Sequence, residues 1–165
     1  MMNKKILFVC MGNICRSPAA EGIMNTLIKK NNLEKFIQVD SAGTIAYHTD
    51  EGADPRMKKQ AAKRGYDLTS VARKFDPEND FESFDYIVTM DDENYFNVLE
   101  LDPDGKYIDK IHKMAEFSSY VDVSEVPDPY FGGSKGFEIV LDILEDSCTN
   151  LLKKIKEDAE SENKK

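Results

Sequence analysis

One segment, residues 10–17, constrains the fold more than any other, and its sequence is CMGNICRS. It follows a continuous apolar run at residues 6–9 and precedes apolar residues at helical spacing within residues 23–28. A continuous apolar run is typical of a strand in a parallel sheet that is covered on both faces. The segment is therefore expected to be a short loop that joins a buried strand to a helix, the unit from which α/β domains are built.

The same alternation of strands and helices continues along the chain. Strands are expected at 4–10, 36–41, 84–90 and 110–114, and helices at 17–30, 55–64, 91–101 and 134–156. Ser17 is expected to cap the first helix, with Pro18 at its first helical position. The pattern predicts a single three-layer α/β domain at residues 1–157, with about four parallel strands in a Rossmann-like sheet and helices on both faces. A charged tail at 158–165 is expected to fray.

Charge and composition exclude several classes of function. The 165 residues include 22 Lys and Arg against 31 Asp and Glu, which gives a formal net charge of -9 at pH 7. Such a chain repels nucleic-acid phosphates, and it has no run of about 18 apolar residues to cross a membrane, so neither partner is expected. The apolar run at 6–9 is too short for a signal peptide, and three cysteines fit a reducing compartment. We expect a cytoplasmic protein, although export without a signal peptide stays open.

The loop at residues 10–17 has the composition of an anion-binding site. Gly12 and Asn13 tolerate left-handed backbone, which lets N–H groups point inward at the start of the helix, where the helix dipole adds positive potential. This potential suits phosphate and also favours the thiolate form of Cys10. Arg16 can hold two phosphoryl oxygens at once, and Ser17 can donate a hydrogen bond to the sulfur. The residues expected to bind phosphate are Met11, Gly12, Asn13, Ile14, Cys15, Arg16 and Ser17.

The pattern C-x5-R-S is typical of cysteine-dependent phosphatases, but two cysteines in one loop allow other interpretations. A zinc site needs about four ligands, and Cys148, His48 and His112 do not stand at ligand spacing. Thioredoxin-like sites have two residues between their cysteines, whereas four separate Cys10 from Cys15. Cys148 falls on the apolar face of the last helix and is expected in the core. No metal or cofactor is expected. A transient disulfide, with Cys15 as a redox guard of Cys10, stays open.

Five blocks in order resemble the low-molecular-weight protein tyrosine phosphatases, over about Lys4 to about Ile155. The blocks are Cys10 to Pro18, Asp40 to Thr44, Asp54 to Arg56, Met90-Asp91 with Asn94, and Asp128 to Phe131. The resemblance implies the phosphotyrosine phosphatase I type of fold and hydrolysis of protein phosphotyrosine or small aryl phosphates. It also implies a phosphotyrosine-containing protein as partner. A monomer is expected, and weak dimerisation through Tyr130 stays open.

The roles of individual residues follow from this resemblance. Cys10 resembles the nucleophile that forms a phosphocysteine, Arg16 the phosphate clamp, and Asp128 the general acid and then the base. Such an acid suits the chemistry, since a phenolate with a pKa of about 10 leaves more easily when a proton is delivered to it. The residues implied to hold the loop in shape are Asn13, Ser17 and Ser41. Aromatic walls suit a flat phenyl phosphate. The implied substrate cleft consists of Ile14, Tyr47, Tyr130 and Phe131.

Two departures from the family and three rival functions bear on these roles. Ser70 stands where many relatives carry histidine, which leaves the support of the loop there open, and Phe131 replaces a tyrosine often found in relatives. Arsenate reductases of this fold use two mid-chain cysteines, and the sequence has none between Cys15 and Cys148. Protein arginine phosphatases have threonine at the position of Ile14. The isoleucine side chain prefers an apolar ring, so Ile14 favours phosphotyrosine. A phosphate-binding module without catalysis is disfavoured because nucleophile, clamp and acid are all retained.

Overall fold

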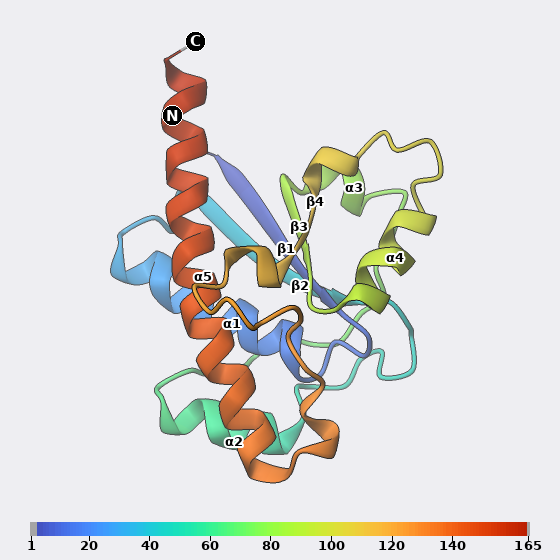
Figure 1. The fold of residues 1–165 in the computed structure, drawn as a ribbon, viewed down its shortest axis with the longest axis vertical. Coiled ribbons are helices and arrows are strands. Elements are labelled where there is room, and N and C mark those ends of the chain that lie inside the picture. Colours follow the sequence, from blue (N-terminus) through green and yellow to red (C-terminus); the bar gives the residue numbers. More distant parts are fainter. Residues whose placement is uncertain (1–2, 165) are drawn as a thin grey trace.

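Within residues 3–164, which the computed structural model describes apart from the side chain of Phe131, four parallel strands form the central sheet (Figure 1). The strands are β1 at Lys4–Cys10, β2 at Ile37–Gly43, β3 at Tyr86–Thr89 and β4 at Ile111–Lys113. Their order is β2-β1-β3-β4, and each neighbouring pair is parallel. The predicted four-stranded parallel sheet is confirmed.

Helices and short 3-10 turns join these strands over the described residues. The helices are α1 at Arg16–Lys30, α2 at Pro55–Lys63, α3 at Asp80–Ser83, α4 at Asp92–Glu100 and α5 at Gly133–Asn163. The 3-10 turns are η1 at Ile108–Lys110, η2 at Met114–Phe117 and η3 at Pro129–Phe131. The short helix α3 was not expected, because four residues are too few for a helical pattern to be seen in the sequence.

The side chains of β1 divide the core between the two faces of the sheet. Ile6 and Phe8 belong to a core cluster with residues of α1 and α5, which pack against each other (Figure 1). Leu7 and Val9 belong to a second cluster that includes Phe81 of α3 and Val98 of α4. Successive side chains of a strand point to opposite faces, so a strand that is apolar throughout is covered on both. The three-layer α/β domain is therefore confirmed.

The start of α1 differs from the expectation. The helix begins at Arg16 with Cys15 in the N-cap position, and no side chain caps it. Ser17 is thus inside the helix and Pro18 is its third residue, so the prediction of Ser17 as the cap is wrong. The hydroxyl of Ser17 is bonded elsewhere, to Cys10 and Asn13. In contrast, the side chain of Asp91 caps α4, which begins close to the predicted start at residue 91.

The C-terminal end of α5 also differs from the expectation. The helix continues through Asn163, so its predicted end near residue 156 is wrong, and the segment expected to be a tail is helical as far as it is described. Two side-chain contacts hold this end against the sheet, and one of its residues is buried. Ala159 is buried, the hydroxyl of Tyr86 donates to Asp158 Oδ2 at 2.7 Å, and Lys4 Nζ lies 2.8 Å from Glu162 Oε2. The charged composition alone did not reveal that Lys4 and Tyr86, the first residues of β1 and β3, offer these partners.

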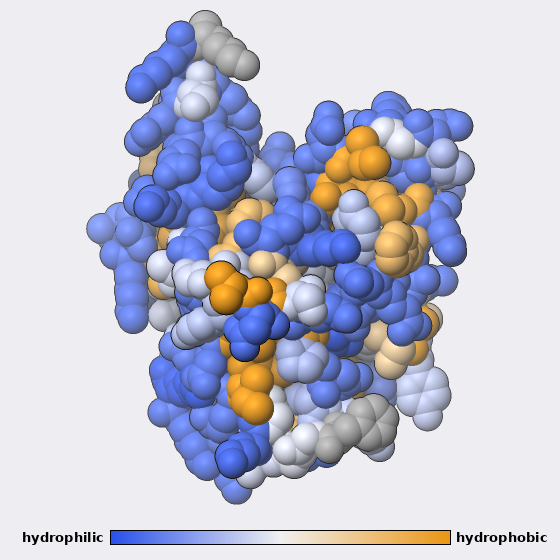
Figure 2. Space-filling model, viewed as in Figure 1, coloured by the Kyte–Doolittle hydropathy of each residue, from blue (hydrophilic) through white to orange (hydrophobic). Residues whose placement is uncertain are grey.

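The surface is largely hydrophilic, in keeping with the excess of charged residues. On the face shown in Figure 2, polar side chains cover most of the molecule and apolar side chains are confined to separate patches. Among residues 3–164, no helix combines the length and the apolar character that a membrane span requires.

The contact between Tyr86 and Asp158 gives a test of how α5 is anchored. Burial, followed by the nearby Asp158, raises the pKa of Tyr86, so its hydroxyl is a donor at neutral pH. We expect Tyr86→Phe to lower the free energy of unfolding by about 1 kcal/mol and to speed amide hydrogen exchange in residues 156–162.

The matched control is Tyr66→Phe, which removes a hydroxyl that donates to Glu145 Oε2 on the same helix at 2.9 Å. That control should leave exchange in residues 156–162 unchanged. Equal exchange in the two variants would contradict the anchoring of the helix end by Tyr86.

Candidate active site

The loop from Cys10 to Ser17, called the phosphate loop from here on, leaves β1 at the carboxyl end of the sheet. Ligands of α/β proteins bind at this end. Cys10 is the last residue of β1, and its partner on β2 is Gly43. A Cβ atom at Gly43 would lie only 2.7 Å from the carbonyl oxygen of Met11, so a glycine is required for the loop to pass this close. The loop is thus packed directly against the neighbouring strand.

Asn13 folds the phosphate loop back over the sulfur of Cys10. Its backbone is left-handed, with φ of 58°, and its N–H donates to Cys10 Sγ at 3.3 Å. Its side-chain nitrogen donates to Ser17 Oγ at 2.8 Å, and Ser17 Oγ lies 3.0 Å from Cys10 Sγ. Its side-chain oxygen accepts from the backbone N–H of Arg73 at 3.0 Å. Asn13 and Ser17 therefore bond to the sulfur and to each other, as expected of loop supports.

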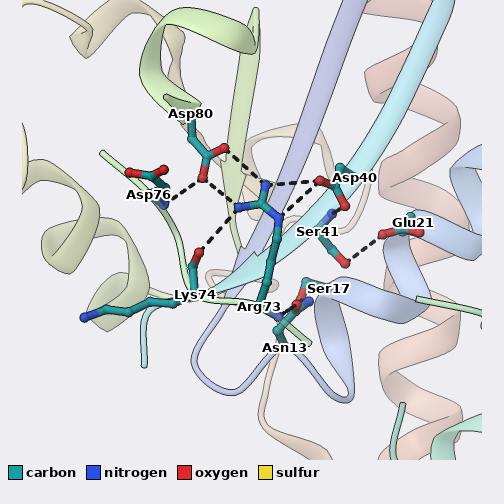
Figure 3. Close-up of polar contacts among 9 residues, drawn as sticks. All are labelled: Asn13, Ser17, Glu21, Asp40, Ser41, Arg73, Lys74, Asp76 and Asp80. Atoms are coloured by element: carbon teal, nitrogen blue, oxygen red, sulfur yellow. Dashed lines mark hydrogen bonds and ion pairs between the residues drawn. The ribbon is translucent and has the colours of Figure 1, made fainter. Parts of the chain in front are cut away.

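Ser41 has a different role from the one expected. Its hydroxyl donates to Glu21 Oε1 of α1 at 2.7 Å, and not to the phosphate loop (Figure 3). Burial raises the pKa of Glu21, although the bond from Ser41 opposes this shift. Ser41 therefore ties β2 to α1, and the expectation that it holds the loop together with Asn13 is corrected. Ser70 does not support the loop either, since among the described residues its buried hydroxyl has no hydrogen-bond partner.

Arg16 is held in place by two other elements at this end of the sheet. Its side chain is only 4% exposed, and Nη1 donates to Asp91 Oδ2 at 2.6 Å and to the carbonyl oxygen of Val126 at 3.1 Å. Burial alone would lower the pKa of Arg16, but the charges of Cys10 and Asp91 raise it on balance. The sequence placed Asp91 only in the block Met90-Asp91 with Asn94 and predicted no role for it at the site. Its position directly after a buried strand was the signal that it lies at the site.

A cavity of about 400 Å³ opens above the phosphate loop. Its lining brings together the three residues expected to do the chemistry, which are Cys10, Arg16 and Asp128. The other lining residues are Met11, Gly12, Ile14, Cys15, Ile45, His48 and Tyr130. The sequence prediction thus located both the floor of the cavity and one wall.

The opposite wall is not the one expected. Tyr47 does not line the cavity; it is 83% exposed and meets the ring of His48 edge-on, with centroids 4.8 Å apart. Ile45 and His48 form this wall instead, because the N–H of Ile45 donates to the carbonyl oxygen of Met11 and holds the segment after β2 against the phosphate loop. His48 also pairs with Glu51. The side chain of Phe131, the remaining expected cleft residue, lies outside the described part of the structure.

Asp128 and Tyr130 are held over the cavity by a short turn and by α2. The Asp128 carboxylate accepts from the N–H of Tyr130 at 3.0 Å and caps η3. The guanidinium of Arg56 lies 5.3 Å from the centre of the Tyr130 ring, and Asp54 holds Arg56 through Oδ1 and Oδ2. The N–H of Asp54 donates to the carbonyl oxygen of Ile14 at 2.8 Å. This chain of contacts joins the Asp128 turn to the phosphate loop.

The three cysteines differ in their surroundings, and none is disulfide-bonded. Burial, reinforced by Asp54, raises the pKa of Cys15 to about 12, so it is a thiol at neutral pH. Cys148 is fully buried among core residues, as expected, and burial raises its pKa as well. Within residues 3–164 no group of three or more His, Cys, Asp or Glu side chains is placed to hold a metal ion.

Comparison with known proteins identifies the family. Residues 5–161 match the family model described as low molecular weight phosphotyrosine protein phosphatase. A protein of Synechocystis sp., whose name assigns it to the low molecular weight protein-tyrosine-phosphatases, is 51% identical over 148 residues, which are 90% of this chain and 94% of the relative.

Solved structures agree with this result. A protein tyrosine phosphatase of Entamoeba histolytica, solved with Hepes in the active site, is 48% identical with a TM-score of 0.90, over 95% of this chain and 99% of that one. An arginine phosphatase of Drosophila is 30% identical with a TM-score of 0.85, over 92% and 98% of the two chains. The chain belongs to the low molecular weight phosphotyrosine protein phosphatase family, and it is a hydrolase of the protein-tyrosine-phosphatase class.

Proposed function

We propose that the protein hydrolyses phosphotyrosine in proteins, and small aryl phosphates, in two steps through a phosphocysteine on Cys10. One observation carries the proposal, namely that Cys10, Arg16 and Asp128 line the same cavity above the phosphate loop. A nucleophile, a bidentate cation and a carboxyl group are the three groups that the transfer of a phosphoryl group through a thiol requires. From the sequence we also propose a cytoplasmic monomer that acts on a phosphotyrosine protein without a cofactor.

In the first step the thiolate of Cys10 attacks phosphorus. The bond between phosphorus and the tyrosyl oxygen breaks, and Asp128 donates a proton to that oxygen so that tyrosine leaves neutral. Arg16 and the loop N–H groups hold the remaining phosphoryl oxygens, and the positive end of α1 stabilises their charge. Because Arg16 is fixed by Asp91 and Val126, little reorganisation is needed when the substrate binds.

In the second step water displaces the sulfur. Asp128, now a carboxylate, takes a proton from the water, whose oxygen bonds to phosphorus while the sulfur–phosphorus bond breaks. The sulfur leaves as a thiolate, which the hydroxyl of Ser17 and the N–H of Asn13 stabilise from 3.0 Å and 3.3 Å. Inorganic phosphate is then released and the enzyme is restored.

The cavity wall supports an aromatic substrate. Ile14, Ile45 and Tyr130 present apolar surface on both sides of the phosphate loop. A flat phenyl ring fills such a slot, whereas a guanidinium would leave its donors without partners there. The likeness to the Drosophila arginine phosphatase makes phosphoarginine the substrate to compare. We propose that Ile14 favours phosphotyrosine over phosphoarginine, and the lack of mid-chain cysteines disfavours arsenate reduction.

A substrate panel tests the activity and the nucleophile together. The wild type should hydrolyse phosphotyrosine peptides far faster than phosphoserine or phosphoarginine peptides, and it should not reduce arsenate. Cys10→Ser should lose turnover by roughly a thousandfold or more while inorganic phosphate still binds, because the loop N–H groups and Arg16 remain. Steady-state kinetics and phosphate titration measure both. Full activity in Cys10→Ser, or a preference for phosphoarginine, would overturn the assignment.

The general-acid role of Asp128 is tested by varying the leaving group. Asp128→Ala should lower kcat about a hundredfold for phosphotyrosine, whose phenolate needs a proton. It should lower kcat much less for a nitrophenyl phosphate, because nitrophenolate leaves without one. The comparison uses the same variant on two substrates, so a folding defect would lower both rates alike. An equal loss on both substrates would remove Asp128 from this role.

Cys15 is proposed as a redox guard of Cys10, since both cysteines line the same cavity. Peroxide oxidises the Cys10 thiolate to a sulfenic acid, and attack by Cys15 then forms the disulfide and releases water. We expect the wild type to regain activity with a thiol reductant after peroxide treatment, and Cys15→Ser to regain much less. Assays before and after reduction measure this. Identical recovery in the two proteins would refute the guard.

A further inference from the structure

Arg73 lies outside the cavity, yet it is bound by two carboxylates beside the phosphate loop (Figure 3). Its guanidinium meets Asp80 with two parallel bonds, Nη1 to Oδ2 at 2.9 Å and Nη2 to Oδ1 at 3.2 Å. On its other edge Nε and Nη2 donate to Asp40 Oδ2 at 3.2 Å and 3.1 Å. The planar guanidinium of arginine can bind two carboxylates in this way, whereas the ammonium of lysine is a point charge and cannot.

Each carboxylate also accepts a backbone N–H, and the side chain of Asp40 is 48% exposed. Asp80 is only 5% exposed and also accepts from the N–H of Asp76 at 2.7 Å. Asp40 belongs to β2, and its Oδ1 accepts from the N–H of Ser41 at 2.8 Å. The guanidinium therefore joins β2 to α3 through bonds to both carboxylates.

The backbone of Arg73 is what this clamp positions. Its carbonyl oxygen accepts from the N–H of Gly43 at 2.8 Å, and the N–H of Phe75 donates to the carbonyl oxygen of Gly43 at 2.7 Å. The segment thus lies beside the end of β2. On its other side the N–H of Arg73 donates to Asn13 Oδ1 at 3.0 Å. The clamp holds this N–H against the phosphate loop.

The direction of each hydrogen bond follows from that N–H. A backbone N–H can only donate, so the oxygen of the Asn13 amide must face Arg73 and its nitrogen must face Ser17. The nitrogen donates to Ser17 Oγ, which leaves the single proton of Ser17 free to point at Cys10 Sγ, 3.0 Å away. A thiolate accepts hydrogen bonds and cannot donate them. The chain of bonds from Arg73 therefore ends in a donor aimed at the sulfur.

We propose that Arg73 is a positioning residue, which fixes the orientation of Asn13 and through it makes Ser17 a donor to the Cys10 thiolate. The catalytic role of Arg73 rests on the proposed function, but the effect of Arg73 on the Cys10 sulfur can be measured without turnover. Arg16, Asp128 and His48 also face Cys10 around the cavity, and they are left unchanged in every variant.

The test compares Arg73→Lys and Arg73→Met with matched changes at Arg64. Arg64 is likewise bound by several carboxylates, those of Glu138, Asp142 and Glu145, but these belong to α5. Arg64→Lys and Arg64→Met therefore remove a comparable clamp without touching Asn13. Alkylation of Cys10 by iodoacetamide across a pH range is the first readout. Cys15 and Cys148 do not interfere, because burial raises the pKa of both.

We expect Arg73→Met to slow alkylation at pH 7 by about tenfold and to move its pH midpoint upward, since one charge-assisted bond to the thiolate is lost. Arg73→Lys keeps the charge and should show a smaller change in the same direction. In turnover, kcat should fall while KM changes little. Neither Arg64 variant should alter the alkylation profile. If Arg73→Met does not fold, Arg73→Lys carries the comparison.

A double-mutant cycle separates positioning from a general loss of structure. In an Asn13→Ala background the effect of Arg73→Lys on alkylation should vanish, because the connecting amide is gone. An effect of the same size in that background, or an unchanged profile in both Arg73 variants, would overturn the proposal. Alkylation could change as expected while turnover stays the same. That result would support the positioning role of Arg73 and contradict the proposed catalytic role of Cys10.

Discussion

The site depends on one residue, Asn13, whose left-handed backbone turns the phosphate loop over the sulfur of Cys10. That conformation costs a non-glycine residue roughly 1 kcal/mol. Bonds from its N–H to Cys10 and from its side chain to Ser17 and Arg73 offset the cost, each by about 1 kcal/mol. An asparagine suits this position because its amide both donates and accepts, so it can join a backbone donor to a hydroxyl acceptor. The loop shape and the surroundings of the sulfur are thus set by the same bonds.

The parallel sheet supplies the frame in which Asn13 can act. Because β1, β2 and β3 are parallel, their carboxyl ends meet at one end of the sheet, where Cys10 and Gly43 end β1 and β2 and Asp91 follows β3. Each contributes differently, since Cys10 carries the sulfur, Gly43 allows the loop to approach, and Asp91 orients Arg16. The turn with Asp128 belongs to the segment between β4 and α5, and Asp128 lines the same cavity.

Much of this arrangement could be predicted from the sequence, and the errors have physical causes. The continuous apolar run before Cys10 and the spacing of Cys10 and Arg16 were local signals, and they gave the sheet and the floor of the site. Ser17 was misjudged because its hydroxyl had two uses, capping and bonding to the sulfur, and only the fold decided between them.

Residues whose roles depend on distant partners left no local signal. Tyr47 points outward because the backbone bond of Ile45 to Met11 turns Ile45 and His48 inward. Ser41 found a partner in Glu21, and the end of α5 found partners in Tyr86 and Lys4, all far away in the sequence. The clamp on Arg73 joins segments separated by 33 residues on one side, so no local pattern could show it.

We propose above all that the sulfur of Cys10 carries the phosphoryl group between the two steps of the reaction. The most direct test is to quench a reaction with an aryl phosphate in acid and to locate any phosphoryl group by mass spectrometry of the peptides. We expect a phosphoryl adduct at the sulfur of Cys10 during turnover, and none after the substrate is exhausted. Two results would contradict this role of Cys10. One is an adduct on another residue. The other is no adduct during hydrolysis at full rate, with a quench to which phosphocysteine is stable.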